Sequence, residues 1–317
     1  MIGSIAGLLL GLLLLALGGD SITKAASGLA QRCGASPFVA GLLLVAFGTS
    51  LPELAVNLRA FAVGAQELAL GNAVGSNIVN LGLTLPLAAL AAPLLLRMRL
   101  LAPLLVLLAV ATLALIVFGL DGAIGRIEGA VLLLGFAGVV WLLLRRGRLE
   151  SAAVQEAVGR YAVTRTPLGL NLLRLLIASA LLYYGARWVV GSATGLGAAL
   201  GLTPLLVGLL PVAIGTALPE VAAAIFAARR GQGDMVAGHV IGSSLFNLLV
   251  IVGGMAALRP LPLPASFVRL ELPAAIAFVL VLYPMLRGDL RISRREGAIL
   301  LAAFCAWVGL ELALLAY

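Results

Sequence analysis

Charged residues are scarce in this sequence. Only 11% of its 317 residues are charged, whereas 62% are hydrophobic. Soluble domains contain about 25% charged residues, so this chain cannot cover a water-facing surface, and lipid must be its main solvent. Histidine and cysteine are also scarce. With one histidine, His239, and two cysteines, Cys33 and Cys305, the sequence excludes a His-rich metal cluster, and we expect no disulfide.

Long apolar stretches account for most of the chain. A transmembrane helix needs about 20 apolar residues, and ten such stretches are present. They cover 2–18, 36–62, 69–91, 100–119, 125–144, 168–191, 203–228, 235–257, 267–286 and 296–316. The first lacks the basic region that opens a signal peptide, so we expect it to be a retained helix. The predicted fold is an all-α membrane protein of ten transmembrane helices.

The basic residues are placed asymmetrically. Of the 21 Lys and Arg residues, 16 lie in or beside odd-numbered connections and 5 in or beside even-numbered ones. The positive-inside rule then predicts cytoplasmic odd-numbered loops, with both termini outside an inner (plasma) membrane. The net charge of +8 therefore reflects topology, and we expect no nucleic-acid partner.

The second half of the sequence repeats the first at a fixed offset. Glu220 follows Glu53 by 167 residues, and the match continues without a gap over about 65 residues. Other pairs at this offset are Thr49 and Thr216, Pro52 and Pro219, Gly71 and Gly238, Ser76 and Ser243, and Asn80 and Asn247. Each copy contains five helices, so the second must enter the membrane from the opposite side. We therefore predict inverted repeats in residues 1–144 (helices 1–5) and 168–317 (helices 6–10), joined by a basic cytoplasmic linker, 145–167.

Two matching segments place a proline directly before a glutamate inside an apolar helix. They are VAFGTSLPE at 45–53 and VAIGTALPE at 212–220. Proline lacks an amide hydrogen, and its ring collides with the carbonyl four residues earlier. Freed carbonyls inside a membrane need a partner, which a bound cation supplies. The residues that predict broken helices 2 and 7 are Gly48, Pro52, Gly215 and Pro219.

The two glutamates are costly inside a membrane. A charged side chain at a helix centre costs on the order of 2.5–3.5 kcal/mol on insertion scales. Two facing carboxylates also repel each other, so either a cation neutralises them or one of them takes up a proton. Calcium prefers six to eight oxygen ligands, which carboxylates, threonine hydroxyls and freed carbonyls supply here. Soft ligands are absent from these segments, which argues against zinc or copper.

A second pair of segments adds polar side chains without adding charge. They read GNAVGSNIVN at 71–80 and GHVIGSSLFN at 238–247. Ser76 and Asn80 are four residues apart and share a helix face, as do Ser243 and Asn247. We interpret these residues as lining the ion site, although small residues also pack helices closely. His239 takes the place of Asn72, and its role stays open between proton sensing and a helix–helix hydrogen bond.

At these segments the sequence resembles the prokaryotic sodium/calcium exchangers of the calcium/cation antiporter superfamily. The resemblance implies an alternating-access antiporter with a central cluster of calcium and sodium positions. The implied calcium ligands are the carboxylates of Glu53 and Glu220 and backbone oxygens of Thr49 and Thr216. The implied ligands of one sodium position are Ala46, Thr49, Ser50, Glu53 and Ser76, and those of the other are Ala213, Thr216, Glu220 and Ser243. Asn80 and Asn247 would line the middle of the cluster.

Two positions depart from the family pattern. Ala217 stands where the pattern has serine, which removes a hydroxyl from the second sodium position. Asn247 stands where some relatives have aspartate, which argues against a potassium dependence. Two carboxylates balance one calcium ion or two sodium ions, and a third sodium ion would leave the site positive. Electroneutral and electrogenic exchange both remain open.

Other functions fit the sequence less well. A proton/calcium antiporter of the same fold remains the main alternative, although it would not need the extra oxygen ligands. An intramembrane enzyme would need a nucleophile–base pair, which is absent, and a channel has no need of repeated broken helices. We expect no enzyme activity and no cofactor besides the transported Ca²⁺ and Na⁺. The expected partners are these ions and the lipid bilayer; a monomer suits the sequence, which leaves the oligomeric state open.

Overall fold

The chain folds into an all-helical membrane protein. The structure is a computed structural model that describes residues 1–32, 40–41, 43–44, 47–147, 149–162, 167–287 and 290–314. In these ranges, nine helices are long and apolar enough to cross a membrane. They cover Ile2–Ala26, Gln66–Ala91, Leu101–Asp121, Arg126–Gly147, Leu168–Leu200, Pro204–Arg229, Gly233–Leu258, Phe267–Met285 and Arg294–Leu314. The remaining predicted span, 36–62, includes residues outside the described ranges.

Several spans combine α-helix with short 3₁₀ (η1, η3) or π (η2, η4–η6) segments. In chain order the elements are α1 (Ile2–Arg32), η1 (Gly48–Ser50), α3 (Leu51–Ala62), α4 (Gln66–Val79), η2 (Asn80–Thr84), α5 (Leu85–Ala91), β1 (Leu94–Leu95), α6 (Leu101–Phe118), η3 (Gly119–Asp121), β2 (Ala123–Ile124), α7 (Arg126–Gly147), α8 (Ala152–Ala162), α9 (Leu168–Leu200), α10 (Pro204–Val207), η4 (Gly208–Val212), α11 (Ala213–Arg229), α12 (Gly233–Phe246), η5 (Asn247–Val252), α13 (Gly253–Leu258), β3 (Leu261–Pro262), η6 (Phe267–Glu271), α14 (Leu272–Arg287), β4 (Arg291–Ile292) and α15 (Arg294–Leu314). The backbone therefore leaves α-helical geometry at several points within the bundle.

The first helix of each half is longer than the sequence suggested. The predicted spans ended at residues 18 and 191, but α1 continues to Arg32 and α9 to Leu200. Beyond its apolar part, α1 carries an ion pair between Lys24 and Asp20, with 2.6 Å between Nζ and Oδ2. Pairs four residues apart stabilise a helix, which explains how α1 extends past the apolar stretch.

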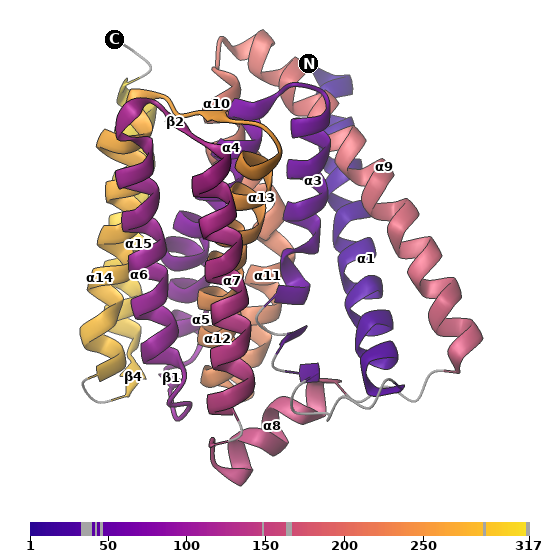
Figure 1. Ribbon diagram of the computed structural model, residues 1–317, viewed down its shortest axis with the longest axis vertical. Helices are drawn as coiled ribbons and strands as arrows, with labels where there is room; N and C mark the ends of the chain where they lie inside the picture. Colours follow the sequence, from indigo (N-terminus) through magenta and orange to yellow (C-terminus); the bar gives the residue numbers. More distant parts are fainter. Residues whose placement is uncertain are drawn as a thin grey trace.

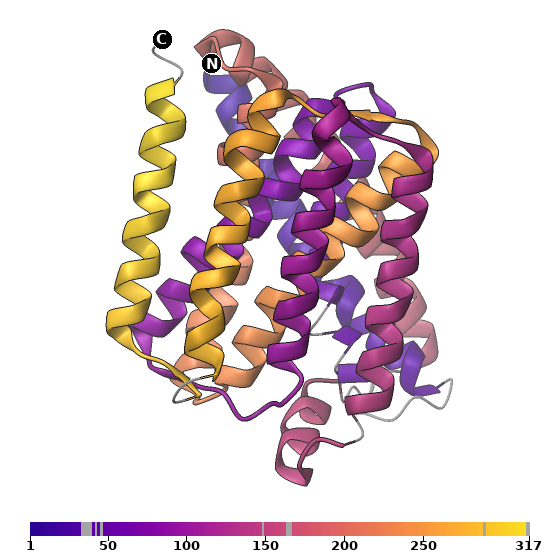
Figure 2. The ribbon, with the colours of Figure 1, turned by 60° about the vertical axis from the view of Figure 1, so that its left-hand side comes forward.

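The centre of the bundle is formed by the segments α4–η2–α5 and α12–η5–α13. Their most apolar windows are 83% buried, compared with 22% for α7 and α9. Around them, α1 and α9 lie side by side on one flank, with α14 and α15 on the opposite flank (Figure 1). Figure 2 shows α14, α6 and α7 standing side by side across another face. The polar side chains of α4 and α12 are thus kept away from lipid.

Helices α1 and α9 approach each other through glycine. A Cβ atom added to Gly11 would lie 2.9 Å from the Gly185 carbonyl oxygen, and one added to Gly185 would lie 3.0 Å from the Gly11 carbonyl oxygen. A Cβ atom added to Gly18 would lie 3.1 Å from the carbonyl oxygen of Ala178. Small residues allow such close backbone contact between membrane helices, so these positions hold the two long helices together.

Two short antiparallel ladders close the ends of the bundle. At one end β1 pairs with β4, with Leu94 opposite Ile292. At the other end β2 pairs with β3, with Ile124 opposite Leu261 (Figure 1). The beginning of α1 and the end of α15 lie at the β2–β3 end, whereas α8 lies at the β1–β4 end. The first residues of α1 and the last residues of α15 therefore lie on the same side of the bundle.

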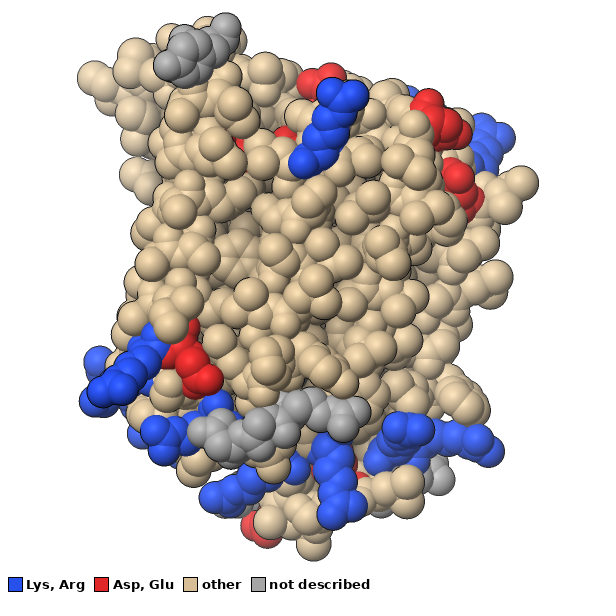
Figure 3. Space-filling model, turned by 90° about the vertical axis from the view of Figure 1, so that its left-hand side faces the viewer, with Lys and Arg blue, Asp and Glu red and all other residues tan. Residues whose placement is uncertain are grey.

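The charged residues gather at the two ends and leave an uncharged belt between them (Figure 3). Most of the basic side chains on this face lie at the β1–β4 end. Arg145 and Arg146 in the last turn of α7 and Arg294 in the first turn of α15 belong to this end. The belt and the nine apolar helices of the described ranges identify a multi-pass membrane protein.

The predicted linker contains a helix that the sequence analysis did not identify. Helix α8 spans Ala152–Ala162 and packs against α1. Val154 and Val158 are buried, with 6% and 3% of their surface exposed. Glu150, just before α8, accepts a hydrogen bond of 2.9 Å from the backbone N–H of Leu100. The linker is thus attached to the basic end of the bundle.

Cys305 is exposed on α15, and Cys33 lies outside the described residues.

Candidate functional site

Glu53 and Glu220 are buried in the middle of the bundle. Glu53 is the third residue of α3 and is 2% exposed, and Glu220 lies in the middle of α11 and is 8% exposed. Helices α3 and α11 are in contact, and the charge of Glu53 repels that of Glu220. Within the described ranges, neither carboxylate is paired with a Lys or Arg. One oxygen of each, Oε2, has no hydrogen-bond partner.

Burying these two carboxylates is energetically unfavourable unless a positive charge is supplied. Buried carboxylates are normally paired or bound to metal, because desolvation disfavours the charged form. Two carboxylates that repel each other raise that cost further. A cation between them removes the repulsion and supplies the missing partner for both unsatisfied oxygens. The geometry therefore suits a site for a small hard cation.

The two prolines take different positions in their helices. Pro52 is the second residue of α3, directly after the 3₁₀ segment Gly48–Ser50. Pro219 lies inside α11, which runs from Ala213 to Arg229. The irregular backbone before α11 is the π segment η4, which contains Pro211. Both Pro52 and Pro219 line a cavity of about 250 Å³ that also reaches Glu220, so the two proline segments meet at the site.

The two threonines make different hydrogen bonds. The buried Thr216 hydroxyl donates to the carbonyl oxygen of Val212 at 3.0 Å or of Ala213 at 3.2 Å. Thr49 is half-buried, and its hydroxyl forms a hydrogen bond of 2.8 Å with Nδ1 of His239. The Ala213 carbonyl, an expected sodium ligand, is therefore one of two oxygens within hydrogen-bond distance of the Thr216 hydroxyl. The corresponding Ala46 lies outside the described residues.

Serine and asparagine side chains form a buried network beside the carboxylates. The Ser50 hydroxyl donates to Ser243 Oγ at 2.6 Å, and Asn80 Nδ2 donates to the same oxygen at 3.3 Å. Ser76, on the buried face of α4, has a hydroxyl without a hydrogen-bond partner. The Oδ1 atom of Asn247 is likewise unpartnered. The structure thus brings Ser50, Ser243 and Asn80 together and leaves oxygen atoms nearby that can accept a ligand.

The sequence analysis missed two asparagines in this region. Asn77 Nδ2 donates to the backbone oxygen of Ser244 at 3.1 Å, and Asn247 Nδ2 donates to Asn77 Oδ1 at 3.1 Å. Asn57 Nδ2 donates to the backbone oxygen of Glu53 at 2.8 Å. Ser244 follows Asn77 by 167 residues, so the repeat offset could have identified Asn77. Asn57 has no polar counterpart at that offset and gave no such signal.

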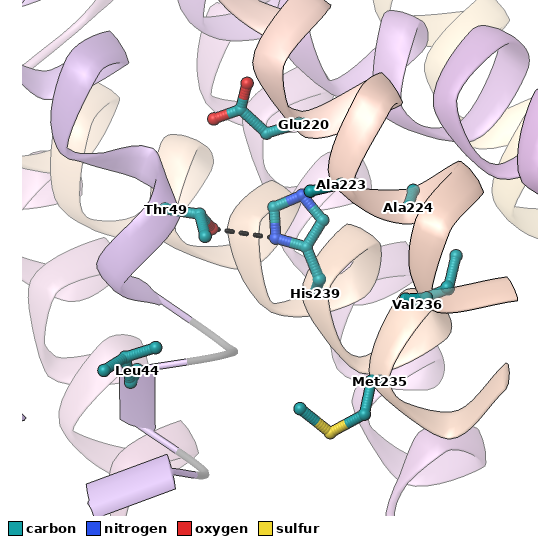
Figure 4. A pocket seen from close by; sticks show the side chains of 9 residues that line it. Leu44, Thr49, Glu220, Ala223, Ala224, Met235, Val236 and His239 are labelled. Carbon is teal, nitrogen blue, oxygen red and sulfur yellow. Dashed lines mark hydrogen bonds between the residues drawn. The ribbon is translucent and has the colours of Figure 1, made fainter. Parts of the chain in front are cut away.

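Two cavities lead away from Glu220. One, of about 120 Å³, is lined by Thr49, Glu220, Ala227, Met235 and His239 among others (Figure 4). The other, of about 250 Å³, extends from Glu220 to Asp20 on α1. Met235 lies in the first turn of α12, which packs against β1. The first cavity therefore connects the site with the basic end of the bundle.

The candidate site is rich in oxygen and poor in soft ligands. Among the described residues, no group of three or more His, Cys, Asp or Glu side chains could hold a metal ion. Apart from the imidazole of His239, the groups around Glu53 and Glu220 are hydroxyls, amides and carbonyls, which suit calcium and sodium better than zinc or copper.

Comparison with known proteins decides the family. The profile described as "Sodium/calcium exchanger protein" matches residues 3–145 and 170–312. The chain belongs to the sodium/calcium exchanger family. Members of this family are transporters.

Full-length relatives include proteins from bacteria and archaea. The chain is 34% identical to the "Inner membrane protein YrbG" of Escherichia coli, over 98% of this chain and 97% of that protein. It is 30% identical to the "Sodium/calcium exchanger MaX1" of Methanosarcina acetivorans, over 95% and 96% of the two chains. The structure resembles the sodium-calcium exchanger NCX_Mj in crystals soaked with Na⁺ and Sr²⁺. The TM-score is 0.68 and the identity 28%, over 97% of this chain and 98% of that one.

Proposed function

We propose that this protein is a secondary active antiporter that exchanges sodium for calcium by alternating access. The observation that carries this proposal is the pair of buried carboxylates, Glu53 and Glu220, each with an unpartnered oxygen, in a member of an exchanger family. The bound cations neutralise the pair, and the neutral site can change its exposure from one side to the other. An empty site would carry two buried negative charges, which opposes that change and couples the two fluxes.

We further propose that the chain consists of two inverted repeats, 1–144 and 168–317, around a linker at 145–167. The strand pairs support this. Adding 167 to Leu94 gives Leu261, and adding 168 to Ile124 gives Ile292. The pairing of Leu94 with Ile292 thus corresponds to that of Leu261 with Ile124 at the other end. An inverted repeat generates such a swapped pair of ladders.

Other contacts between the two halves also occur twice, at the repeat offset. The approach of Gly18 to Ala178 and that of Gly185 to Gly11 are one contact repeated at an offset of 167 residues. Asn77 donates a hydrogen bond to its own counterpart, Ser244, as expected for residues beside a pseudo-two-fold axis. The family profile matches two segments at the same offset. Helix 2 would be broken at Gly48 and Pro52, where the 3₁₀ segment η1 meets α3. The predicted break of helix 7 at Gly215 and Pro219 is wrong, because α11 runs through both residues and the irregular backbone is η4, one turn earlier.

We propose the following ligands for the transported ions. Calcium would bind the carboxylates of Glu53 and Glu220 with backbone oxygens of Thr49 and Thr216. The sodium positions would use Ala46, Thr49, Ser50, Glu53 and Ser76 on one side, and Ala213, Thr216, Glu220 and Ser243 on the other. Asn80 and Asn247 would line the middle. Burial of the serines and asparagines and the unpartnered oxygens of Ser76 and Asn247 support this assignment.

For orientation, we propose an inner (plasma) membrane location with the β1–β4 end in the cytoplasm and both termini outside. The gathering of basic side chains at that end supports this topology (Figure 3). Ser151 is exposed beside α8. In a cysteine-free background, Ser151→Cys should react with an impermeant maleimide in inverted vesicles and stay unlabelled in intact cells. Labelling in intact cells would reverse the orientation.

The exchange itself is tested by calcium flux into proteoliposomes. Sodium-loaded vesicles should take up Ca²⁺ when diluted into sodium-free buffer, and reversing the sodium gradient should reverse the flux. Separate proton and potassium gradients test the alternatives. Uptake driven by a proton gradient and indifferent to sodium would identify a proton/calcium antiporter instead.

A further inference from the structure

Two charged side chains stand beside the larger cavity of the site. Asp20 on α1 lines the cavity of about 250 Å³ together with Glu220, and Lys24 Nζ lies 2.6 Å from Asp20 Oδ2. Both belong to the apolar span Ile2–Ala26, yet their side chains are 63% and 59% exposed. Charged side chains within a membrane span usually face a water-filled cavity. This cavity has room for several water molecules of about 30 Å³ each, so we interpret Asp20 as its water-filled mouth.

The mouth lies on the side of the β1–β4 end. Helix α1 begins at the β2–β3 end and runs toward α8 at the β1–β4 end (Figure 1), and Asp20 lies in its second half. The same turn of α1 packs against the start of α3, because a Cβ atom added to Gly19 would lie 2.7 Å from Pro52 Cγ. An ion that enters this cavity from the β1–β4 end therefore passes Asp20 before it reaches Glu220.

The two carboxylates of this cavity differ in how firmly they are held. Asp20 is paired with Lys24 four residues away, and exposed ion pairs of this kind contribute little to stability. Glu220 is 8% exposed, and within the described part of the chain its Oε2 atom has no hydrogen-bond partner. An incoming cation can thus displace the Lys24 ammonium group easily and then move on to the buried, unsatisfied carboxylate.

We propose that Asp20 is an entry site that recruits the transported cations from the β1–β4 end, with Lys24 as its replaceable counter-ion. This inference rests on the proposed function, because Asp20 supplies ions to the same pair of buried carboxylates. A negative charge at the mouth of a cleft with low-dielectric walls raises the local cation concentration and the association rate. Lys24 opposes this effect, since its positive charge lies at the same mouth.

The repeat makes this entry site a property of one half of the chain. At the offset of 167 residues, Asp20 corresponds to Arg187 and Lys24 to Gly191. The second half therefore carries a basic residue where the first half carries the acid. Unlike Glu53 and Glu220, Asp20 has no acidic counterpart, so recruitment belongs to one side of the membrane.

The ion pair also stabilises α1, and a purely structural role predicts a different result. Removing either partner breaks the pair, so a structural role gives changes of the same sign in both variants. Recruitment predicts changes of opposite sign. Asp20→Asn removes a charge that attracts cations, whereas Lys24→Gln removes one that repels them.

The test measures how fast Ca²⁺ associates with the purified full-length protein in stopped flow, with a fast calcium indicator reporting the free ion. The samples are wild type, Asp20→Asn, Lys24→Gln and Glu67→Gln. Glu67→Gln is the matched control, because it removes the same charge from an exposed position on α4 that does not line this cavity. Thermal unfolding confirms that each variant is folded.

In about 0.01 M choline chloride, where the Debye length is about 30 Å, the two variants should differ most. We expect association to slow about fivefold in Asp20→Asn and to accelerate about twofold in Lys24→Gln. Both differences should shrink in about 1 M salt, where the Debye length is about 3 Å, and Glu67→Gln should match wild type. Changes of the same sign in both variants, effects that salt does not reduce, or equal slowing in Glu67→Gln would overturn the proposal.

Calcium flux into proteoliposomes separates this proposal from the antiport function. If wild type shows the charge-dependent association but no sodium-driven calcium flux, the antiport proposal fails while the entry site stands. Sodium-driven flux with equal association rates in all four proteins would overturn the entry site alone. Absence of calcium binding to wild type would overturn both.

Discussion

The hydroxyl of Ser50 donates a hydrogen bond to Ser243 across 2.6 Å, joining the two halves of the chain beside the carboxylates. The positions equivalent to Ser50 and Ser243 at the repeat offset are Ala217 and Ser76. Alanine has no hydroxyl, and the Ser76 hydroxyl has no hydrogen-bond partner. The polar network is therefore complete on one side of the site and incomplete on the other.

Restoring the missing hydroxyl should strengthen sodium binding. In Ala217→Ser, the new side chain adds an oxygen to the second sodium position. We expect the sodium concentration for half-maximal exchange to fall roughly fivefold, equivalent to about 1 kcal/mol for one added polar interaction. The measurement is calcium flux in proteoliposomes as a function of sodium. Ala222→Ser, on an exposed position of the same helix, is the matched control, and an equal effect in both variants would exclude the proposed role.

The Ser50–Ser243 hydrogen bond should show energetic coupling. Each single alanine variant removes one partner, so the double variant should lose less than the sum of the two. A double-mutant cycle on sodium affinity should give a coupling of about 1 kcal/mol for a buried hydrogen bond. The pair Ser50 and Ser76, between which no hydrogen bond is present, should show coupling close to zero. Additive losses for Ser50 and Ser243 would contradict the assignment.

Neutralising either carboxylate should abolish exchange. Glu53→Gln and Glu220→Gln keep the shape of the side chain but remove one charge that faces the cation. Loss of one partner of a buried charge pair costs on the order of 3–5 kcal/mol, which corresponds to at least a hundredfold weaker calcium binding. Calorimetry and flux measure the two effects. Glu67→Gln, at an exposed position in the first turn of α4, should behave as wild type, and substantial transport by either site variant would remove that residue from the ligand set.

Filling the close contact between α1 and α9 should destabilise the protein. Gly11→Val places methyl groups against the Gly185 carbonyl, which lies 2.9 Å from a Cβ at this position. Overpacking of this kind costs about 1–3 kcal/mol, so thermal unfolding in detergent should occur several degrees lower. Gly191, also on α9, has no atom within 4 Å of an added Cβ, and Gly191→Val should leave the midpoint unchanged. Similar midpoints for wild type and Gly11→Val would show that this contact is loose.

Much of the architecture could be predicted from hydrophobicity and repetition. The family and the membrane-spanning character are confirmed. Glu53 and Glu220 are both buried, and their role as ion ligands stays a prediction. The lengths of α1 and α9 were underestimated, because polar residues beyond the apolar stretch stay helical through local ion pairs and packing. Helix α8 was missed because a short amphipathic segment between arginine-rich stretches resembles a loop.

The side-chain network was harder to predict. Spacing along one helix pointed to Ser76 and Asn80, but it could not show that Asn80 would join Ser50 at Ser243. That contact depends on how η1, η2 and α12 pack together, which the sequence pattern does not specify. The position of His239 at the cavity also depends on how the helices pack. A lone histidine carries no repeat or spacing signal, so only the three-dimensional arrangement reveals its neighbours.

The central claim is that one calcium ion lies between Glu53 and Glu220. The most direct measurement is an experimental structure of the calcium-loaded protein, with anomalous scattering from Sr²⁺ in place of Ca²⁺ to mark the ion. We predict one strong peak within about 2.3–2.6 Å of oxygens from both carboxylates, and its loss in Glu220→Gln. A peak bound elsewhere, or two carboxyl groups hydrogen-bonded to each other in the presence of calcium, would contradict the account.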